Sequence, residues 1–149
     1  MISKNAIHEA CLSKLQSQMD ELKSAIAKVQ ESIVNEENST AGNKFETARA
    51  MGQEELDRIN RQMSVLVKEY NILSQINLDR PCDSVQLGAV VKTDKKMLYT
   101  SVALGKVEVE NTPIFAISFV SPIGQMLLGK EVGDELVFAG KKEKIEAVY

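Results

Sequence analysis

Residues 12–33 read LSKLQSQMDELKSAIAKVQESI, and their apolar pattern predicts the structure of the first half of the chain. Its apolar residues recur in alternating steps of three and four, at Leu12, Leu15, Met19, Leu22, Ile26, Val29 and Ile33. This spacing is typical of a coiled coil, in which a narrow apolar seam faces a partner helix. A second seam with the same alternation follows at Leu56, Ile59, Met63, Leu66, Tyr70 and Leu73.

The two seams are mirror images, because the residue numbers of facing positions add to 81 or 82, as they do for Leu12 and Tyr70. Antiparallel helices require such a constant sum. Between the seams, residues 35–43 (NEENSTAGN) are turn formers and helix breakers. The sequence therefore predicts an antiparallel coiled-coil hairpin over residues 1–77, with its tip near 35–43 and arms of roughly 50 Å.

Two residues of the pairing carry further expectations. His8 continues the first seam, and we interpret it as a partly buried packing residue, as most histidines on an apolar face are. Val29 is expected to face Gly52, which has no side chain, so we expect the packing to thin towards the tip.

The second half of the chain changes to short β-branched runs. After a linker at 78–84 that contains Pro81, these runs predict strands at 85–92, 97–104, 113–120, 134–138 and 144–149. Turn residues predict hairpins at 93–96 and 139–142. Ser121 is a good N-cap, Pro122 suits the first helical position and Gly129 suits a C-terminal stop. The sequence thus predicts an α+β chain, in which the hairpin precedes a small β-sheet domain (85–149) with one short helix.

Composition excludes several classes of function. The net charge of −3 over 149 residues argues against binding of nucleic acid through general electrostatic attraction. With His8 the single histidine, and with Cys11 and Cys82 at no metal or redox spacing, most histidine- and cysteine-based sites are excluded. No apolar run is long enough to cross a bilayer, and the first residues lack a signal-peptide core. We therefore expect a cytoplasmic protein that is not an enzyme, holds no metal of its own and has no membrane partner.

Residues 121–135 carry the most specific motif, SPIGQMLLGKEVGDE. It resembles the pattern S-P-[IL]-[GA]-x-A-L-[IL]-G-K-x-x-G-D of the bacterial Gre (GreA/GreB) transcription elongation and transcript-cleavage factors, with Met126 in the Ala place. The preceding Ile117–Val120 resembles their strand that leads into the motif. The order of parts is also similar, since Gre factors place an antiparallel coiled coil and a linker before this domain.

The resemblance implies an FKBP-like fold for residues 85–149 and docking of this domain on bacterial RNA polymerase. The coiled coil would pass down the secondary channel and bring its tip close to nascent RNA or DNA. In Gre factors, two tip acids help to hold a weakly bound Mg²⁺ shared with the polymerase, which then cuts its own backtracked RNA. The docking motif implied by the resemblance consists of Ser121, Pro122, Ile123, Gly124, Gly129, Lys130, Gly133 and Asp134.

The tip departs from the Gre pattern G-D-L-x-E-N-x-E-Y. Ser39 and Gly42 stand where the two acids are expected, and the nearest carboxylates are Glu36, Glu37 and Glu46. The candidate tip acids are Glu36 and Glu37. Neither belongs to an Asp-x-x-Glu pair, and both are also interpretable as solvated charges at a helix end.

The functional hypothesis is a Gre-like factor that modulates elongation or stimulates cleavage, and that works as a monomer. Lys44 and Arg49, just after the tip, are candidates for contact with RNA phosphates. The alternatives are a channel-occupying regulator without cleavage activity, an FKBP-like prolyl isomerase or chaperone, and a coiled-coil adaptor. The isomerase is the weaker hypothesis because the chain has no Trp to floor a proline pocket.

Overall fold

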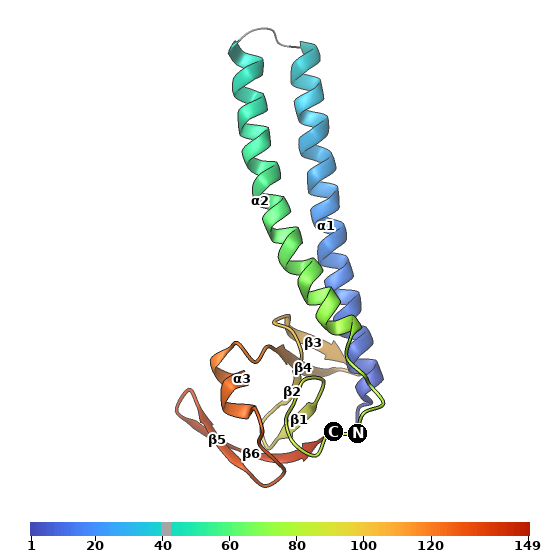
Figure 1. The fold of residues 1–149 in the computed structure, drawn as a ribbon, viewed down its shortest axis with the longest axis vertical. Helices are drawn as coiled ribbons and strands as arrows, with labels where there is room; N and C mark the ends of the chain where they lie inside the picture. The colour runs from blue at the N-terminus through green and yellow to red at the C-terminus, as the bar shows by residue number, and fades with distance from the viewer. Residues whose placement is uncertain (40–42) are drawn as a thin grey trace. The chain divides into compact units, whose positions relative to one another are not determined.

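A computed structural model describes residues 1–39 and 43–149 of the chain, with the side chains of residues 39, 43 and 44 outside the description. Two long helices, α1 (Lys4–Ser39) and α2 (Asn43–Ser74), form its first half (Figure 1). All thirteen seam residues are buried or half-buried, so the seams predicted from the heptad spacing are confirmed.

The chain divides into two compact units. One unit is Gln16–Lys68, the outer part of both helices. The other joins Met1–Leu15 to Glu69–Tyr149, and so contains the first helical turns as well as the sheet. The boundaries 1–77, 78–84 and 85–149 stay a prediction.

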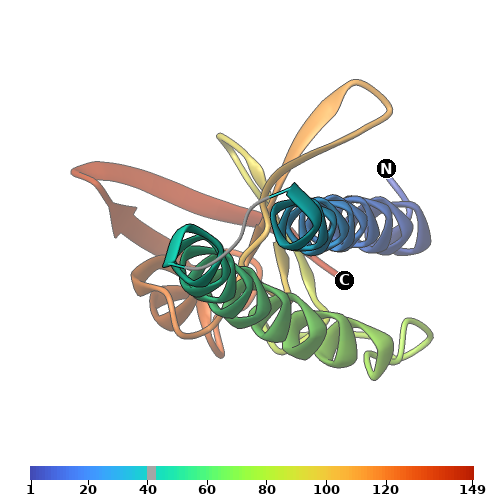
Figure 2. The same cartoon turned by 90° about the horizontal axis from the view of Figure 1, so that it is seen from above.

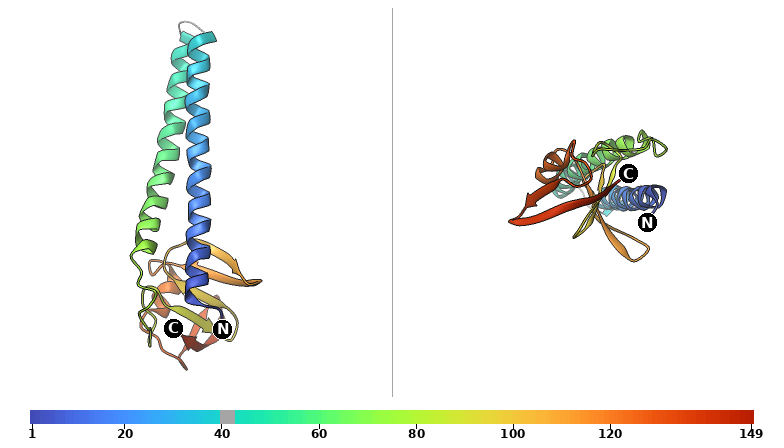
Figure 3. Two further views of the ribbon diagram at one scale, coloured as in Figure 1. Left: turned by 90° about the vertical axis from the view of Figure 1, so that its right-hand side faces the viewer. Right: turned by 90° about the horizontal axis from the view of Figure 1, so that it is seen from below.

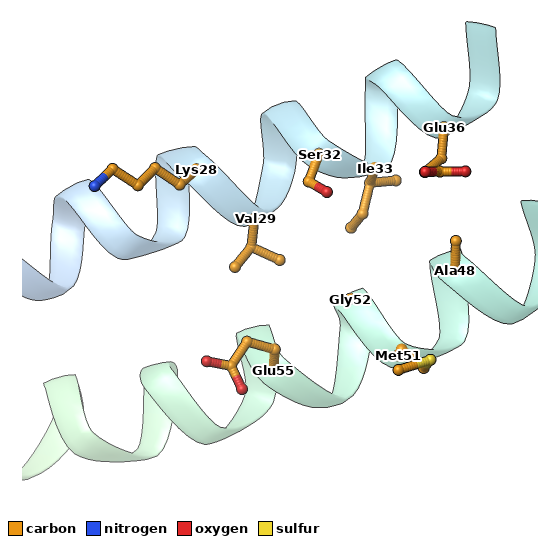
Figure 4. A pocket seen from close by; sticks show the side chains of 9 residues that line it. All are labelled: Lys28, Val29, Ser32, Ile33, Glu36, Ala48, Met51, Gly52 and Glu55. Atoms are coloured by element: carbon orange, nitrogen blue, oxygen red, sulfur yellow. The ribbon is translucent and has the colours of Figure 1, made fainter. Parts of the chain in front are cut away.

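Within the unit Gln16–Lys68, the two helices run antiparallel and approach each other at Gly52 (Figure 4). A Cβ atom added to Gly52 would lie 2.7 Å from Ile33 Cδ1 and 3.8 Å from Val29 Cγ1. Val29 therefore faces Gly52 as predicted. The Ile33 side chain fills the space where a Gly52 side chain would stand. A groove of about 420 Å³ lies beside it, lined by residues that include Val29 and Ala48.

The second half forms one six-stranded mixed sheet. Its strands are β1 (Val90–Thr93), β2 (Met97–Thr100), β3 (Gly105–Val109), β4 (Thr112–Ile117), β5 (Glu135–Phe138) and β6 (Lys141–Val148). Their order is β3-β4-β2-β1-β6-β5, which places the β3–β4 and β5–β6 hairpins at opposite ends of the sheet (Figure 2). Strands β2 and β4 pair in parallel, and the other neighbours are antiparallel. The α+β class is confirmed.

Four strand predictions were wrong in their bounds by three residues or more. The run predicted at 113–120 ends early, since β4 stops at Ile117. The run predicted at 97–104 is divided, since β2 ends at Thr100 and a separate strand, β3, begins at Gly105. Strand β3 was missed because charged residues alternate with its two valines, and it turns into β4 through Glu110 and Asn111 at positive φ. Strand β1 begins at Val90, since the chain before it makes turn and loop hydrogen bonds instead. Strand β6 begins three residues early, at Lys141, where it pairs with Phe138 of β5.

The core of this unit lies between one face of the sheet and the short helix α3 (Pro122–Leu127). It is made of aliphatic side chains from α3, four strands and the loop before β1: Val85, Val91, Leu98, Ile123, Leu127, Leu136 and Ile145. Burying them stabilises the domain by roughly 1.5–3 kcal/mol for each side chain. The predicted helix between the third and fourth runs is confirmed.

The beginning of α1 belongs to the same unit as the sheet. His8 Nδ1 and the Tyr99 hydroxyl are hydrogen-bonded at 2.8 Å, and Lys14 Nζ donates to the carbonyls of Leu104 and Lys106, each at 2.8 Å. The two chain ends lie side by side, because the Tyr149 hydroxyl donates to the Ile2 carbonyl (Figure 3). His8 is 5% exposed, so its interpretation as a packing residue is confirmed.

Candidate docking motif and hairpin tip

The motif opens with a capped helix start. The Ser121 side chain accepts a hydrogen bond from the Gly124 amide at 3.1 Å and donates one to the Ser118 carbonyl at 2.6 Å. Pro122, at the first helical position, needs no amide partner there. Together these two residues fix where α3 begins.

Gly124 lets α3 pack directly against the chain that enters it. A Cβ atom added there would collide with the Ser118 carbonyl oxygen and lie 2.8 Å from Phe119 Cα. Because both obstacles are backbone, no side chain fits at this position. Ile123 beside it is buried in the core.

Gly129 and Lys130 pair with the segment before β1. The Gly129 amide donates to the Val85 carbonyl, and the Val85 amide donates to the Lys130 carbonyl, both at 2.8 Å. Gly129 has φ +81°, a left-handed conformation that favours glycine at the end of a helix.

Gly133 and Asp134 shape the turn that follows. Gly133 has φ +94°, and its amide donates to the Ile145 carbonyl at 2.9 Å. The Asp134 carboxylate accepts from the Glu131 amide at 2.8 Å, which closes the turn on itself. With the exception of Lys130, each motif residue thus has a structural role inside the domain, either through its side chain or, for the glycines, through its backbone.

Four apolar residues that interleave with the motif are exposed instead. Val120 is 84% exposed, Met126 41%, Leu128 57% and Val132 58%. Sequence reasoning passed over them because it looked for residues that match the Gre pattern. Their positions in the sequence could have indicated their exposure. The helix α3 has only six residues, and Ile123, Gly124 and Leu127 already fill its buried face.

The two candidate acids of the tip lie in the last turns of α1. Glu36 is half-buried and lines the groove beside Ala48 and Met51, whereas Glu37 is exposed (Figure 4). Consecutive helical residues point about 100° apart. The structure therefore does not bring Glu36 and Glu37 together as a pair.

The cations predicted near RNA are only partly described. Arg49 is exposed on α2, and the Lys44 side chain lies outside the described residues, as does Gly42. Among the residues that the structure describes, no three His, Cys, Asp or Glu side chains are placed to hold a metal ion. In the same part of the chain, no helix is long and apolar enough to cross a membrane.

Sequence reasoning missed one buried charge, Glu143 on β6. Its side chain accepts from Thr93 Oγ1 at 2.8 Å and pairs with Lys96 Nζ at 3.0 Å, and Lys96 also lies over the Phe138 ring. These contacts tie the β1–β2 turn to the β5–β6 hairpin. The signal was weak, because β6 is rich in charged residues that are otherwise exposed.

Hairpin and sheet domain together define the class of protein: a long antiparallel helical hairpin joined to a small mixed α+β domain. Residues 80–148 match the family described as "Transcription elongation factor, GreA/GreB, C-term". The second half of the chain is therefore a GreA/GreB C-terminal domain, which confirms the resemblance carried by residues 121–135.

A solved structure titled "Structure of the transcription factor Gfh1" is similar to this chain at 20% sequence identity. The likeness covers 93% of this chain and 92% of that one, with a TM-score of 0.35. No curated protein matches the chain.

Proposed function

We propose that this protein binds bacterial RNA polymerase through its C-terminal domain and inserts its hairpin into the secondary channel. The observation that supports this proposal is the GreA/GreB match over residues 80–148. The long helical hairpin that precedes this domain is consistent with it. Helices of 36 and 32 residues extend about 50 Å. The protein is not itself an enzyme in this proposal, and it acts in the cytoplasm on the active centre of the polymerase.

Of the two versions of this function, we propose channel occupation without stimulated cleavage. A second Mg²⁺ needs converging carboxylates, because it is a hard cation that prefers several oxygen ligands. Glu36 faces the groove beside Ala48 while Glu37 is exposed on another side of α1. These two acids do not converge, so the only Mg²⁺ involved would be the one that the polymerase holds.

The test has two parts that use the full chain and bacterial core polymerase. Fluorescence anisotropy of the labelled protein measures binding, and we expect a Kd at or below the micromolar range. Stalled, backtracked elongation complexes measure cleavage, and we expect RNA to shorten no faster than with polymerase alone while elongation slows.

Two results would contradict the proposal. Absence of binding at micromolar concentrations would remove the polymerase as partner. Faster RNA shortening that disappears in the double variant Glu36→Gln/Glu37→Gln would show that the cleaving version is correct.

A further inference from the structure

A cavity of about 390 Å³ lies between the segment that follows α2 and the loop before β1. A Cβ atom added to Gly88 in this loop would lie 2.7 Å from Ile76 Cγ2, so the two segments pack closely beside the cavity. Its volume is within the range of roughly 300–1,000 Å³ that is usual for small-molecule sites. The residues that line it are Gln75, Ile76, Asn77, Arg80, Cys82, Gln86 and Leu87.

The lining offers groups that recognise a carboxylate and a peptide. Arg80 contributes a guanidinium, whose planar fork binds a carboxylate through two hydrogen bonds. Within residues 1–39 and 43–149 this guanidinium forms no ion pair, and the side-chain amides of Gln75 and Gln86 have no hydrogen-bond partner. The described lining holds no acidic residue that would repel an anion. These groups are therefore free to bind a small anionic ligand that also carries amide groups.

The cavity also presents a sulfur atom to such a ligand. Cys82 is 6% exposed, and the Lys4 ammonium donates to its Sγ at 3.6 Å. A cation beside the sulfur is a feature of reactive cysteines, because the thiolate is the nucleophile. Cys11, the other cysteine of the chain, is fully buried, and burial raises its pKa to about 11. We therefore expect Cys82 to be the more reactive of the two thiols.

We propose that this cavity binds small disulfides that carry carboxylates, and that Cys82 exchanges with them to form a mixed disulfide. Arg80 binds a carboxylate of the ligand, and the amides of Gln75 and Gln86 bind its peptide groups. The inference goes beyond the proposed function and does not depend on it, since the reaction needs no polymerase.

The exchange needs no reactant besides the disulfide. The Cys82 thiol loses its proton to water, and its sulfur attacks one sulfur atom of the ligand. The disulfide bond of the ligand breaks as the new sulfur–sulfur bond forms, and the leaving thiolate takes up a proton from water. Cys82 is thereby oxidised and the leaving half of the ligand is reduced, so electrons balance.

The experiment treats the full-length protein with oxidised glutathione, a disulfide of two tripeptides that carry carboxylates. A parallel sample receives the uncharged disulfide of 2-mercaptoethanol. Mass spectrometry of the intact chain measures the rate, and peptide mapping shows which cysteine carries the adduct, so Cys11 is an internal control. Dithiothreitol should remove the adduct, which distinguishes a mixed disulfide from oxidation to a sulfinic or sulfonic acid.

The variant Arg80→Gln tests the recognition of the carboxylate, because it removes the charge and keeps a polar side chain. We expect it to slow the reaction with oxidised glutathione by about threefold, the effect of one exposed ion pair, and to leave the reaction with the uncharged disulfide unchanged. Arg61→Gln, at an exposed position of α2 that does not line the cavity, is the matched control and should change neither rate. Circular dichroism checks that each variant keeps the fold.

An adduct on Cys82 and not on Cys11, together with the selective effect of Arg80→Gln, would support the inference. Equal rates at the two cysteines, or no adduct on Cys82, would overturn it. If Arg80→Gln slowed both disulfides equally, or neither of them, the cavity would not be a carboxylate site. None of these outcomes bears on binding to polymerase, so the proposed function stands or fails separately.

Discussion

Gly124 shows at the scale of one residue how a family motif can encode packing. The space that a Cβ atom would need is occupied by the backbone of Ser118 and Phe119, which cannot rotate away as a side chain can. The helix and the strand end can therefore approach this closely only when the residue between them is glycine.

Replacement of this glycine should be costly. We expect Gly124→Ala to lower the free energy of unfolding by about 3 kcal/mol, because the added methyl group forces the backbone apart. Gln125→Ala, at the exposed neighbouring position, should change it by less than about 0.5 kcal/mol. Urea denaturation followed by circular dichroism measures both, and equal stability of the two variants would contradict the packing argument.

His8 gives the fold a pH dependence whose sign can be worked out. Burial lowers the pKa of His8 below its ordinary value of 6.5, and the nearby Glu9 offsets part of this shift. As the pH falls through 6.5, the unfolded chain therefore binds a proton before the folded chain does. The contribution of His8 to stability is complete above this pH and is lost as the pH falls further.

We therefore expect the free energy of unfolding to decrease between pH 7.5 and pH 5.5, above the range in which most carboxylates titrate. His8→Leu should flatten this decrease, although it also removes the hydrogen bond to Tyr99. Denaturation curves at several pH values measure the slope. A slope that is unchanged in His8→Leu would assign the pH dependence to other groups.

At the scale of elements, the first helical turns of α1 are part of the sheet domain. The ammonium of Lys14 donates to the Leu104 carbonyl in the β2–β3 connection and to the Lys106 carbonyl in β3. Ile7 and Cys11, nearby in the sequence, are fully buried. Burial also raises the pKa of the Cys11 thiol to about 11, which keeps it protonated and unreactive at neutral pH. These contacts join residues that are far apart in the sequence, so no local sequence pattern predicts them.

The Lys14 contacts make a prediction about this element. Lys14→Met retains the aliphatic stem but loses both hydrogen bonds, and we expect it to destabilise the fold by about 2 kcal/mol. Amide hydrogen exchange in residues 101–106 should become faster. Lys23→Met, at an exposed position of α1, is the control and should change neither quantity. Unaltered exchange in Lys14→Met would show that the connection does not depend on α1.

At the scale of the whole molecule, the question is what the tip does. The sequence places Ser39 and Gly42 where the Gre pattern has its two acids, and Glu36 and Glu37 do not replace them as a converging pair. A channel factor of this kind would compete for access to the polymerase active centre without supplying ligands for a second metal ion.

Introducing acids at positions 39 and 42 should change the effect of the protein on cleavage of backtracked RNA. We expect Ser39→Asp/Gly42→Glu to stimulate cleavage of backtracked RNA, and the isosteric pair Ser39→Asn/Gly42→Gln to leave it at the level of polymerase alone. Gel analysis of RNA from stalled complexes measures the difference at several Mg²⁺ concentrations. Equal cleavage with both double variants would show that the alignment of the tip with the Gre pattern is incorrect.

The hairpin, its antiparallel register and the helix that Ser121 caps could be predicted from the sequence alone, because heptad spacing and capping are local patterns. The GreA/GreB C-terminal domain could be predicted in the same way, because its motif preserves the backbone requirements of Gly124, Gly129 and Gly133.

Which of these residues are exposed could be read from the tertiary structure alone. Exposure depends on neighbours that are distant in the sequence, such as the Val85 backbone that pairs with Gly129 and the sheet that covers Leu127. For the same reason the sequence missed Glu143, whose burial depends on Thr93 and Lys96 fifty and forty-seven positions away. Burial is a property of the folded surface, and a one-dimensional pattern records it only where the secondary structure repeats regularly.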